Sequence, residues 1–151
     1  MTCIIFPVSG KAYGGDTMHA HQRILKLTLD CIHTNQHMLR LATAAASAAS
    51  FRLELTEQQN KLDRMESELL QIAGSRGWEL KPALHICFRK RFRRVTDSQI
   101  AETMIRQYSD TLMIALRLLH SLPYPDGLTE TAVDRIRDSL VGCMMSLLSY
   151  L

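Results

Sequence analysis

Helix breakers and aromatic side chains are scarce in this chain of 151 residues, which has seven Gly, four Pro, one Trp, four Tyr and four Phe. Sheet proteins are usually richer in aromatic and β-branched residues than this chain is. Leu, Ala and Met are abundant instead, with eight Met in all, and these residues favour helices. The composition therefore predicts an all-helical protein, and the length is typical of a single domain.

Cysteine pairs at metal-binding spacing are also missing. Cys3, Cys31, Cys87 and Cys143 lie far apart and form no Cys-x-x-Cys motif. A structural zinc site or a disulfide framework would show closer, paired spacing. We therefore interpret the four as reduced thiols, three of them packed or half-buried in the domain.

No window of the sequence reaches 18 consecutive apolar residues, so no membrane-spanning helix is predicted. The short apolar run at residues 1–8 lacks both the basic region and the long apolar region of a signal peptide. We expect a cytoplasmic protein. Residues 1–15 contain three glycines and are expected to form a flexible tail.

Apolar residues recur at helical spacing in four stretches, which predict helices over about 16–47, 51–75, 97–122 and 129–151. The second has the clearest heptad repeat, with a and d positions at Leu55, Gln58, Leu62, Met65, Leu69 and Ile72. The stripes of the other three helices are Leu25, Ile32, Leu39, Ala42 and Ala46; Ile105, Tyr108, Leu112, Ala115, Leu119 and Leu122; and Val133, Ile136, Leu140, Leu147 and Leu151.

The lengths of the connections predict how these helices pack. The first two helices are joined by a short turn, and so are the last two, where Pro123 and Pro125 lie. Short connections make neighbouring helices antiparallel. Residues 77–96 form a longer connection between the two hairpins. We therefore predict a single domain, residues 16–151, folded as an antiparallel up-down four-helix bundle.

The end of the second predicted helix carries a family resemblance. Residues 76–82 read Arg-Gly-Trp-Glu-Leu-Lys-Pro, and the helix begins near Arg52. This segment resembles the spore coat F family and related ferritin-like proteins of spore-forming bacteria, in which such a helix ends in Arg-Gly-Trp-Tyr-x-Pro. The rest of residues 20–151 agrees with the family only in helix lengths and order. The resemblance implies a ferritin-like bundle, often dimeric, with a spore-coat role or an unassigned one.

A likeness to ferritins raises the question of iron. A di-iron bundle uses a Glu on each of two helices and a Glu-x-x-His motif on each of the other two. This chain has no Glu-x-x-His motif. Glu66, with Asp63 three residues before it, stands where spore coat F relatives tend to carry His, and Ala45 stands near a position where the family often has a carboxylate. We therefore expect no di-iron centre and no cofactor, and keep a degenerate metal-binding protein as an alternative.

His33 and His37 are weak candidates for a metal site. They lie four residues apart and share one face of the first helix. No third ligand accompanies them in the sequence. We therefore interpret them as exposed or half-buried helix histidines.

The basic segment in the middle connection is the sharper signal. It contains five of the eighteen basic residues, which leaves thirteen basic against fifteen acidic residues elsewhere. Such a cluster binds phosphates, and Phe92 within it offers a ring for base stacking. The cluster is equally compatible with an acidic partner surface or with an ordinary solvent-exposed loop. Helical nucleic-acid-binding proteins usually spread their basic residues along a recognition helix, whereas these lie in a connection. The residues are Arg89, Lys90, Arg91, Arg93 and Arg94.

Taken together, these patterns favour a non-catalytic structural or interaction protein that acts through helical self-association. The expected partner is a second copy of the chain, with a dimer as the expected oligomer, and other proteins are possible partners. Nucleic-acid binding through residues 89–94 is the alternative from a different class. If the family resemblance holds, the location is the spore coat.

Overall fold

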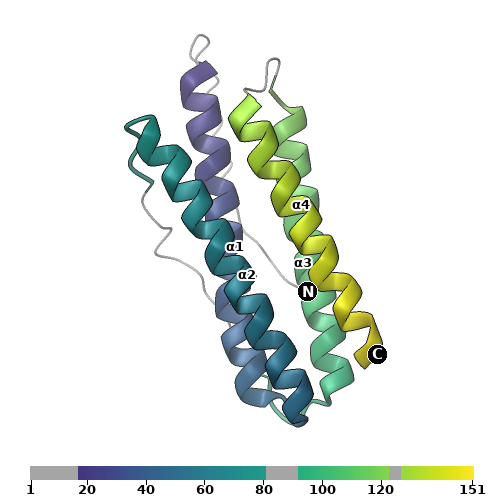
Figure 1. Cartoon of the computed structure of the whole chain (residues 1–151). Coiled ribbons are helices and arrows are strands. Elements are labelled where there is room, and N and C mark those ends of the chain that lie inside the picture. Colours follow the sequence, from purple (N-terminus) through teal and green to yellow (C-terminus); the bar gives the residue numbers. More distant parts are fainter. Residues whose placement is uncertain (1–16, 81–91, 123–126) are drawn as a thin grey trace.

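The computed structural model describes residues 17–80, 92–122 and 127–151, and within them it contains helices and no strand. The prediction of four helices is confirmed (Figure 1). The expected tail at residues 1–15 and the turn at Pro123 and Pro125 lie outside the described residues. No described helix is long and apolar enough to cross a membrane. The elements are α1 (Thr17–Ala45), α2 (Ala49–Ser75), α3 (Asp97–His120), α4 (Gly127–Leu147) and the 3₁₀ helix η1 (Leu148–Tyr150).

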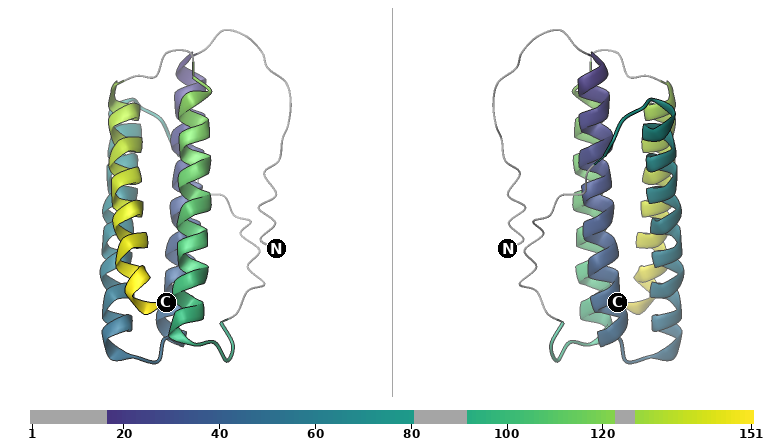
Figure 2. Two further views of the ribbon diagram at one scale, coloured as in Figure 1. Left: turned by 90° about the vertical axis from the view of Figure 1, so that its right-hand side faces the viewer. Right: turned by 90° about the vertical axis from the view of Figure 1, so that its left-hand side faces the viewer.

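The helices form two hairpins that pack side by side. α1 packs against α2 and α3, and α4 packs against α3 and α2 (Figures 1 and 2). α2 and α3 begin at the same end of the bundle, because Asp97 at the start of α3 binds the backbone of the α1–α2 turn. These two helices therefore run in the same direction, whereas the two helices within each hairpin run in opposite directions. The predicted up-down order, in which all consecutive helices alternate in direction, is therefore not confirmed, because the connection between α2 and α3 returns the chain to the end of the bundle where α2 began.

The predicted core stripes of α1 and α2 are largely confirmed. All five predicted positions on α1 are buried. On α2 the predicted positions from Leu55 to Leu69 are buried, while Ile72 is half-buried at the edge of the core. Burial of these stripes stabilises the bundle, because helices of this length are marginal in water by themselves.

The predicted core stripe of α3 is wrong in part. Ile105 and Leu112 were expected in the core but are only half-buried. The buried line lies about one position away and includes polar side chains, because two of them find hydrogen-bond partners on other helices, as described below. Its members are Ile100, Ala101, Met104, Gln107, Tyr108, Thr111 and Ala115.

Two charged side chains stabilise the turn between α1 and α2. The carboxylate of Asp97 accepts hydrogen bonds from the backbone N–H groups of Ser47 (2.7 Å) and Ala48 (2.9 Å). The guanidinium of Arg52 donates to the carbonyls of Ala46 and Ser47 at the end of α1. Ala48, the N-cap of α2, provides no side-chain bond of its own. Asp97 therefore takes the place of a local cap for these backbone donors.

α3 begins with a capping box formed by Thr96 and Gln99. The Thr96 hydroxyl accepts a hydrogen bond from the backbone N–H of Gln99, and the Gln99 side chain accepts one from the backbone N–H of Thr96. This arrangement satisfies two backbone donors at once. Asp97 is thereby left to bind the α1–α2 turn.

The Arg-Gly-Trp segment that carries the family resemblance terminates α2. Gly77 has a φ of +68°, its N–H bonds the carbonyl of Gly74, and the N–H of Trp78 bonds the carbonyl of Ala73. This is the Schellman pattern of helix termination. Trp78 packs half-buried against the core, and the Arg76 guanidinium lies 5.1 Å from its ring centroid.

We expect Gly77→Ala and Gly74→Ala to shift stability in opposite directions. A Cβ at either site would meet no atom within 4 Å, so packing does not separate the two variants. Gly77→Ala should destabilise by about 1 kcal/mol, because φ is positive there. Gly74→Ala should stabilise by about 0.5–1 kcal/mol through helix propensity. Urea unfolding followed by circular dichroism measures both, and equal shifts would contradict the helix-termination role of Gly77.

Candidate functional site

A polar layer crosses the interior of the bundle. The side-chain amide of Gln58, fully buried, donates to the Glu54 carboxylate (2.8 Å), the Ser146 hydroxyl (3.0 Å) and the Cys143 carbonyl (3.2 Å). Its oxygen accepts the Tyr108 hydroxyl at 2.8 Å. Burial, followed by the nearby Cys143 and Glu54, raises the pKa of Tyr108 well above its usual value. The phenol is therefore a fixed donor and does not ionise near neutral pH.

A second buried pair links the two hairpins. The Asn35 amide on α1 donates to the Thr111 hydroxyl on α3 at 2.8 Å, and both side chains are buried. Like Gln58 and Tyr108, these are neutral groups. These two buried pairs therefore consist of amides and hydroxyls, whereas a di-iron centre is held by carboxylates and imidazoles.

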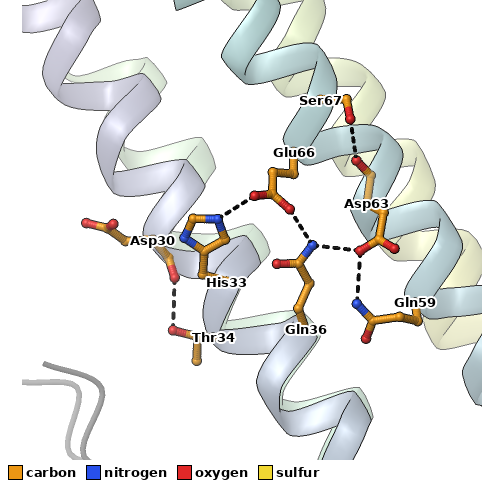
Figure 3. A network of polar contacts seen from close by, with 8 residues as sticks. All are labelled: Asp30, His33, Thr34, Gln36, Gln59, Asp63, Glu66 and Ser67. Atoms are coloured by element: carbon orange, nitrogen blue, oxygen red, sulfur yellow. Dashed lines mark hydrogen bonds and ion pairs between the residues drawn. The ribbon is translucent and has the colours of Figure 1, made fainter. Parts of the chain in front are cut away.

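The ionisable cluster lies instead at the junction of α1 and α2 (Figure 3). His33 Nε2 lies 2.8 Å from one oxygen of Glu66, and the Gln36 amide donates to the other oxygen at 2.8 Å. The same Gln36 nitrogen donates to Asp63 at 2.9 Å, and Gln59 also donates to Asp63. His33 and Gln36, three residues apart on α1, therefore face Asp63 and Glu66, three residues apart on α2.

The Gln36 amide nitrogen occupies the place between two carboxylates. Its opposite orientation would set the amide oxygen against Asp63 and Glu66, which is repulsive, so the hydrogen-bond network fixes the orientation. One N–H of Gln36 serves each carboxylate, and a cation is not required to hold them together. The cluster's evident role is to join α1 to α2.

Glu66 makes this junction dependent on pH. Burial by itself would raise the pKa of Glu66, but hydrogen bonds from Gln36 and His33, with the positive charges of His33 and Arg40, hold it below its usual value. Because the folded-state pKa lies below the unfolded value of about 4.3, the carboxylate stabilises the fold above that pH. The contribution is lost as pH falls through the folded-state pKa.

We expect Glu66→Gln to be less stable than the wild type at pH 7 and to vary less with pH below about 5. The difference should stay below about 1 kcal/mol, because Glu66 is 31% exposed and solvent weakens the interaction. Urea unfolding between pH 7 and pH 3 measures it. Glu57→Gln, at an exposed position of the same helix, is the control. Identical pH profiles for the two variants would contradict the role of Glu66.

His33 and His37, the weak metal candidates, both lie on α1. His33 is engaged with Glu66, and His37 is half-buried one turn further along α1. Among the residues that the structure describes, no group of three or more His, Cys, Asp and Glu side chains is placed to hold a metal ion. Ala45 lies half-buried at the end of α1.

The basic segment is only partly described. Arg89, Lys90 and Arg91 lie outside the described residues. Arg93 and Arg94 are exposed, while the flanking Phe92 and Val95 pack against the core. Arg94 has a φ of +50°, which is unusual for a residue other than glycine. The two arginines thus extend from a short segment that is held at both ends by apolar side chains.

The cysteines offer no reactive thiol among the described residues. Cys31 and Cys143 are free and buried, as predicted, while Cys3 and Cys87 lie outside the described residues. Burial, assisted by Asp30, raises the pKa of Cys31 to about 12. Burial also raises the pKa of Cys143 to about 11, where Lys61 lowers it and Glu54 raises it. Both thiols therefore remain protonated and are poor nucleophiles.

An exposed apolar strip on α4 was missed by the sequence analysis. It consists of Val141, Met145 and Leu148, which are 40%, 63% and 48% exposed. Val141 and Met145, four residues apart, share one face of α4 away from the core stripe, and Leu148 follows them as the first residue of η1. Leu151, predicted in the core stripe, is 61% exposed, so that prediction is wrong. The chain forms η1 after Leu147, and this change of helix type ends the α-helical register.

A groove lies between the second half of α2 and the first half of α4. It has a volume of about 730 Å³. Ile72, Leu128 and Ala132 supply apolar surface, and Arg64 and Arg135 lie along its rim. Arg135 also forms an ion pair with Glu68 across the groove at 2.6 Å. No local sequence pattern predicts this groove, because the two helices that line it are about 60 residues apart in the chain.

Comparison with known proteins gave no relative: no protein-family model, curated protein or solved structure matches the chain. The fold and the site therefore define the class only as an all-α four-helix bundle. Its functional interpretation depends on the surfaces and clusters described above.

Proposed function

We propose that this protein is a non-catalytic structural or interaction protein that acts through helical self-association. The observation that carries the proposal is the apolar strip of Val141, Met145 and Leu148. Single exposed apolar residues are common on protein surfaces, whereas three neighbouring ones at the end of α4 and the start of η1 favour a contact surface. Covering the strip with a second copy removes this apolar area from water.

The rest of the described molecule supports a scaffold. Its interior polar layer is built from groups that bond one another, and its ionisable cluster joins α1 to α2. Buried hydrogen bonds between α1 and α3 and between α2 and α3 favour one packing of these helices over others, while the Asn35 side-chain oxygen stays buried without a hydrogen-bond partner among the described residues. We assign the polar residues described here to structural roles and the α4 surface to association, with a dimer as the first assembled species.

The proposal extends to a ferritin-like arrangement and to a spore-coat-like role. Two hairpins with parallel second and third helices support the arrangement, because a ferritin-like bundle has one long crossover between its hairpins. The role follows from the resemblance of residues 52–82 to the spore coat F family. A bundle of this kind would contribute surface and rigidity to a coat.

Self-association is tested by sedimentation velocity over a range of protein concentrations. We expect the average mass of the wild type to rise with concentration. Met145→Glu should weaken association at least about tenfold, because a buried unpaired charge is costly. Met113→Glu replaces a methionine that is 48% exposed on α3 and should associate as the wild type does. A wild type that stays monomeric at every concentration would refute the proposal.

A further inference from the structure

α4 carries two different apolar surfaces at its two ends. The strip of Val141, Met145 and Leu148 lies toward its C-terminal end, and the groove shared with α2 lies at its N-terminal half. Leu128 in the groove and Met145 in the strip are 17 residues apart, which is about 25 Å along a helix. The two surfaces cannot meet within one molecule.

The strip and the groove also face different sides of α4. Ser146 faces α2, because its hydroxyl bonds Glu54 and Gln58 on that helix. Each residue of the strip is turned by about 100° or more around the helix from Ser146. The groove, in contrast, is open on the side where Arg135 reaches Glu68 of α2. One surface projects outward and the other is concave.

The two surfaces are complementary in chemistry. The groove offers apolar contact through Ile72 and Leu128, and Leu128 is 54% exposed. Its rim offers Arg64 and Arg135, and Arg135 keeps free N–H donors because the bond to Glu68 uses only one of its nitrogens. One turn before the strip, Asp138 is 72% exposed; one of its carboxylate oxygens accepts from the neighbouring Arg137 at 3.0 Å, and the other carries no such bond to Arg137. A strip placed in the groove brings this carboxylate toward the rim arginines.

We infer that the strip of one copy docks in the α2–α4 groove of a second copy. The inference rests on the proposed function and names the two surfaces that meet. The groove is the receiving surface because its lining combines apolar side chains with Arg64 and Arg135. The contact is head-to-tail, since each copy uses a different surface on either side of it.

A head-to-tail contact leaves one strip and one groove unoccupied at the ends of every assembly. Such contacts form open chains unless the rotation between copies closes a ring. The average mass should therefore rise beyond a dimer as concentration increases. A two-fold contact of strip against strip would stop at the dimer.

Two variants that block opposite surfaces test the inference by complementation. Met145→Glu blocks the strip and keeps the groove, and Leu128→Glu blocks the groove and keeps the strip. We expect each variant alone to be monomeric at concentrations where the wild type assembles. An equimolar mixture should form a dimer of twice 17.2 kDa and nothing larger, because only one productive contact remains. A third variant, Thr131→Arg, places a large side chain in the groove from α4 and should behave as Leu128→Glu does.

The outcomes separate this inference from the proposed function. Circular dichroism first establishes that each variant keeps its helical fold. If Leu128→Glu and Thr131→Arg assemble like the wild type, or if the mixture stays monomeric while the wild type assembles, the head-to-tail contact is refuted and self-association stands. If the wild type itself never assembles, the proposed function fails as well.

Discussion

Phe51→Ala is expected to lower the free energy of unfolding by about 3–5 kcal/mol. Phe51 is fully buried in the first turn of α2, and its ring centroid lies 4.5 Å from that of Tyr150 in η1. Removing the ring leaves a cavity between the start of α2 and the end of the chain. It also removes the surface against which Tyr150 packs.

Urea unfolding followed by circular dichroism measures this loss. Leu53→Ala is the matched control, because Leu53 lies in the same turn but is 62% exposed. Apart from the difference in helix propensity between Leu and Ala, this control should lower the free energy of unfolding by less than about 0.5 kcal/mol. Tyr150→Ala should cost less than Phe51→Ala, since Tyr150 is only half-buried. The double variant should lose less than the sum of the two, because they share one contact. Equal losses for Phe51→Ala and Leu53→Ala would show that this end is not packed as described.

The second large effect is expected at Gln58. Gln58→Leu should destabilise by about 2–4 kcal/mol, because the buried Tyr108 hydroxyl and the Cys143 carbonyl each lose a hydrogen-bond partner. Ser146 keeps its bond to Glu54 at 2.6 Å and adds little to the loss. Gln58 is an a/d position of the heptad, so a leucine there continues the apolar stripe without a change of pattern.

A double-mutant cycle identifies the cause of this loss. Tyr108→Phe alone leaves the Gln58 oxygen without its donor and should cost about 1–3 kcal/mol. The double variant Gln58→Leu with Tyr108→Phe removes both the Gln58 oxygen and the Tyr108 hydroxyl, so neither is left without its partner. Its loss of stability should therefore be at least about 1 kcal/mol smaller than the sum of the losses of the two single variants. Strict additivity would mean that the 2.8 Å contact contributes nothing to stability.

The four helices and most of their buried faces follow from local sequence patterns. The heptad repeat of α2 holds from Leu55 to Leu69, and even the polar Gln58 lies in the core as the repeat predicts. This works because helix periodicity alone decides which side chains share a face. The end of α2 was equally predictable, because Gly77 can adopt positive φ at little cost and so terminates a helix locally.

On α3 the same reasoning failed in part, and the cause is specific. A stripe chosen by large apolar side chains runs through Ile105 and Leu112, whereas the buried line runs through Gln107 and Thr111. A polar residue is stable in a core only when a partner meets it. The partner of Thr111 is Asn35, 76 residues away in the chain. No local pattern contains that information.

In the candidate site, too, some residues could be predicted from the sequence, but their contacts could not. His33 and Glu66 were each singled out from the sequence, but for different reasons, and their contact across α1 and α2 was not foreseen. Gln36, whose amide joins Asp63 to Glu66, was not considered at all, because glutamine has no strong signature as a ligand. The α4 strip did have a signal, since Val141 and Met145 share a face that the core stripe does not use.

The sequence by itself determined the helical class, the number of helices and the main buried stripes, because helix propensity and periodicity act over a few neighbouring residues. Only the tertiary structure decided how the two hairpins are directed relative to each other. It also decided the interior polar layer, the α1–α2 cluster and the groove beside α4. Each of these depends on which side chains from distant segments meet. That choice is made by the packing of whole helices, in which burial, hydrogen bonding and shape are satisfied together.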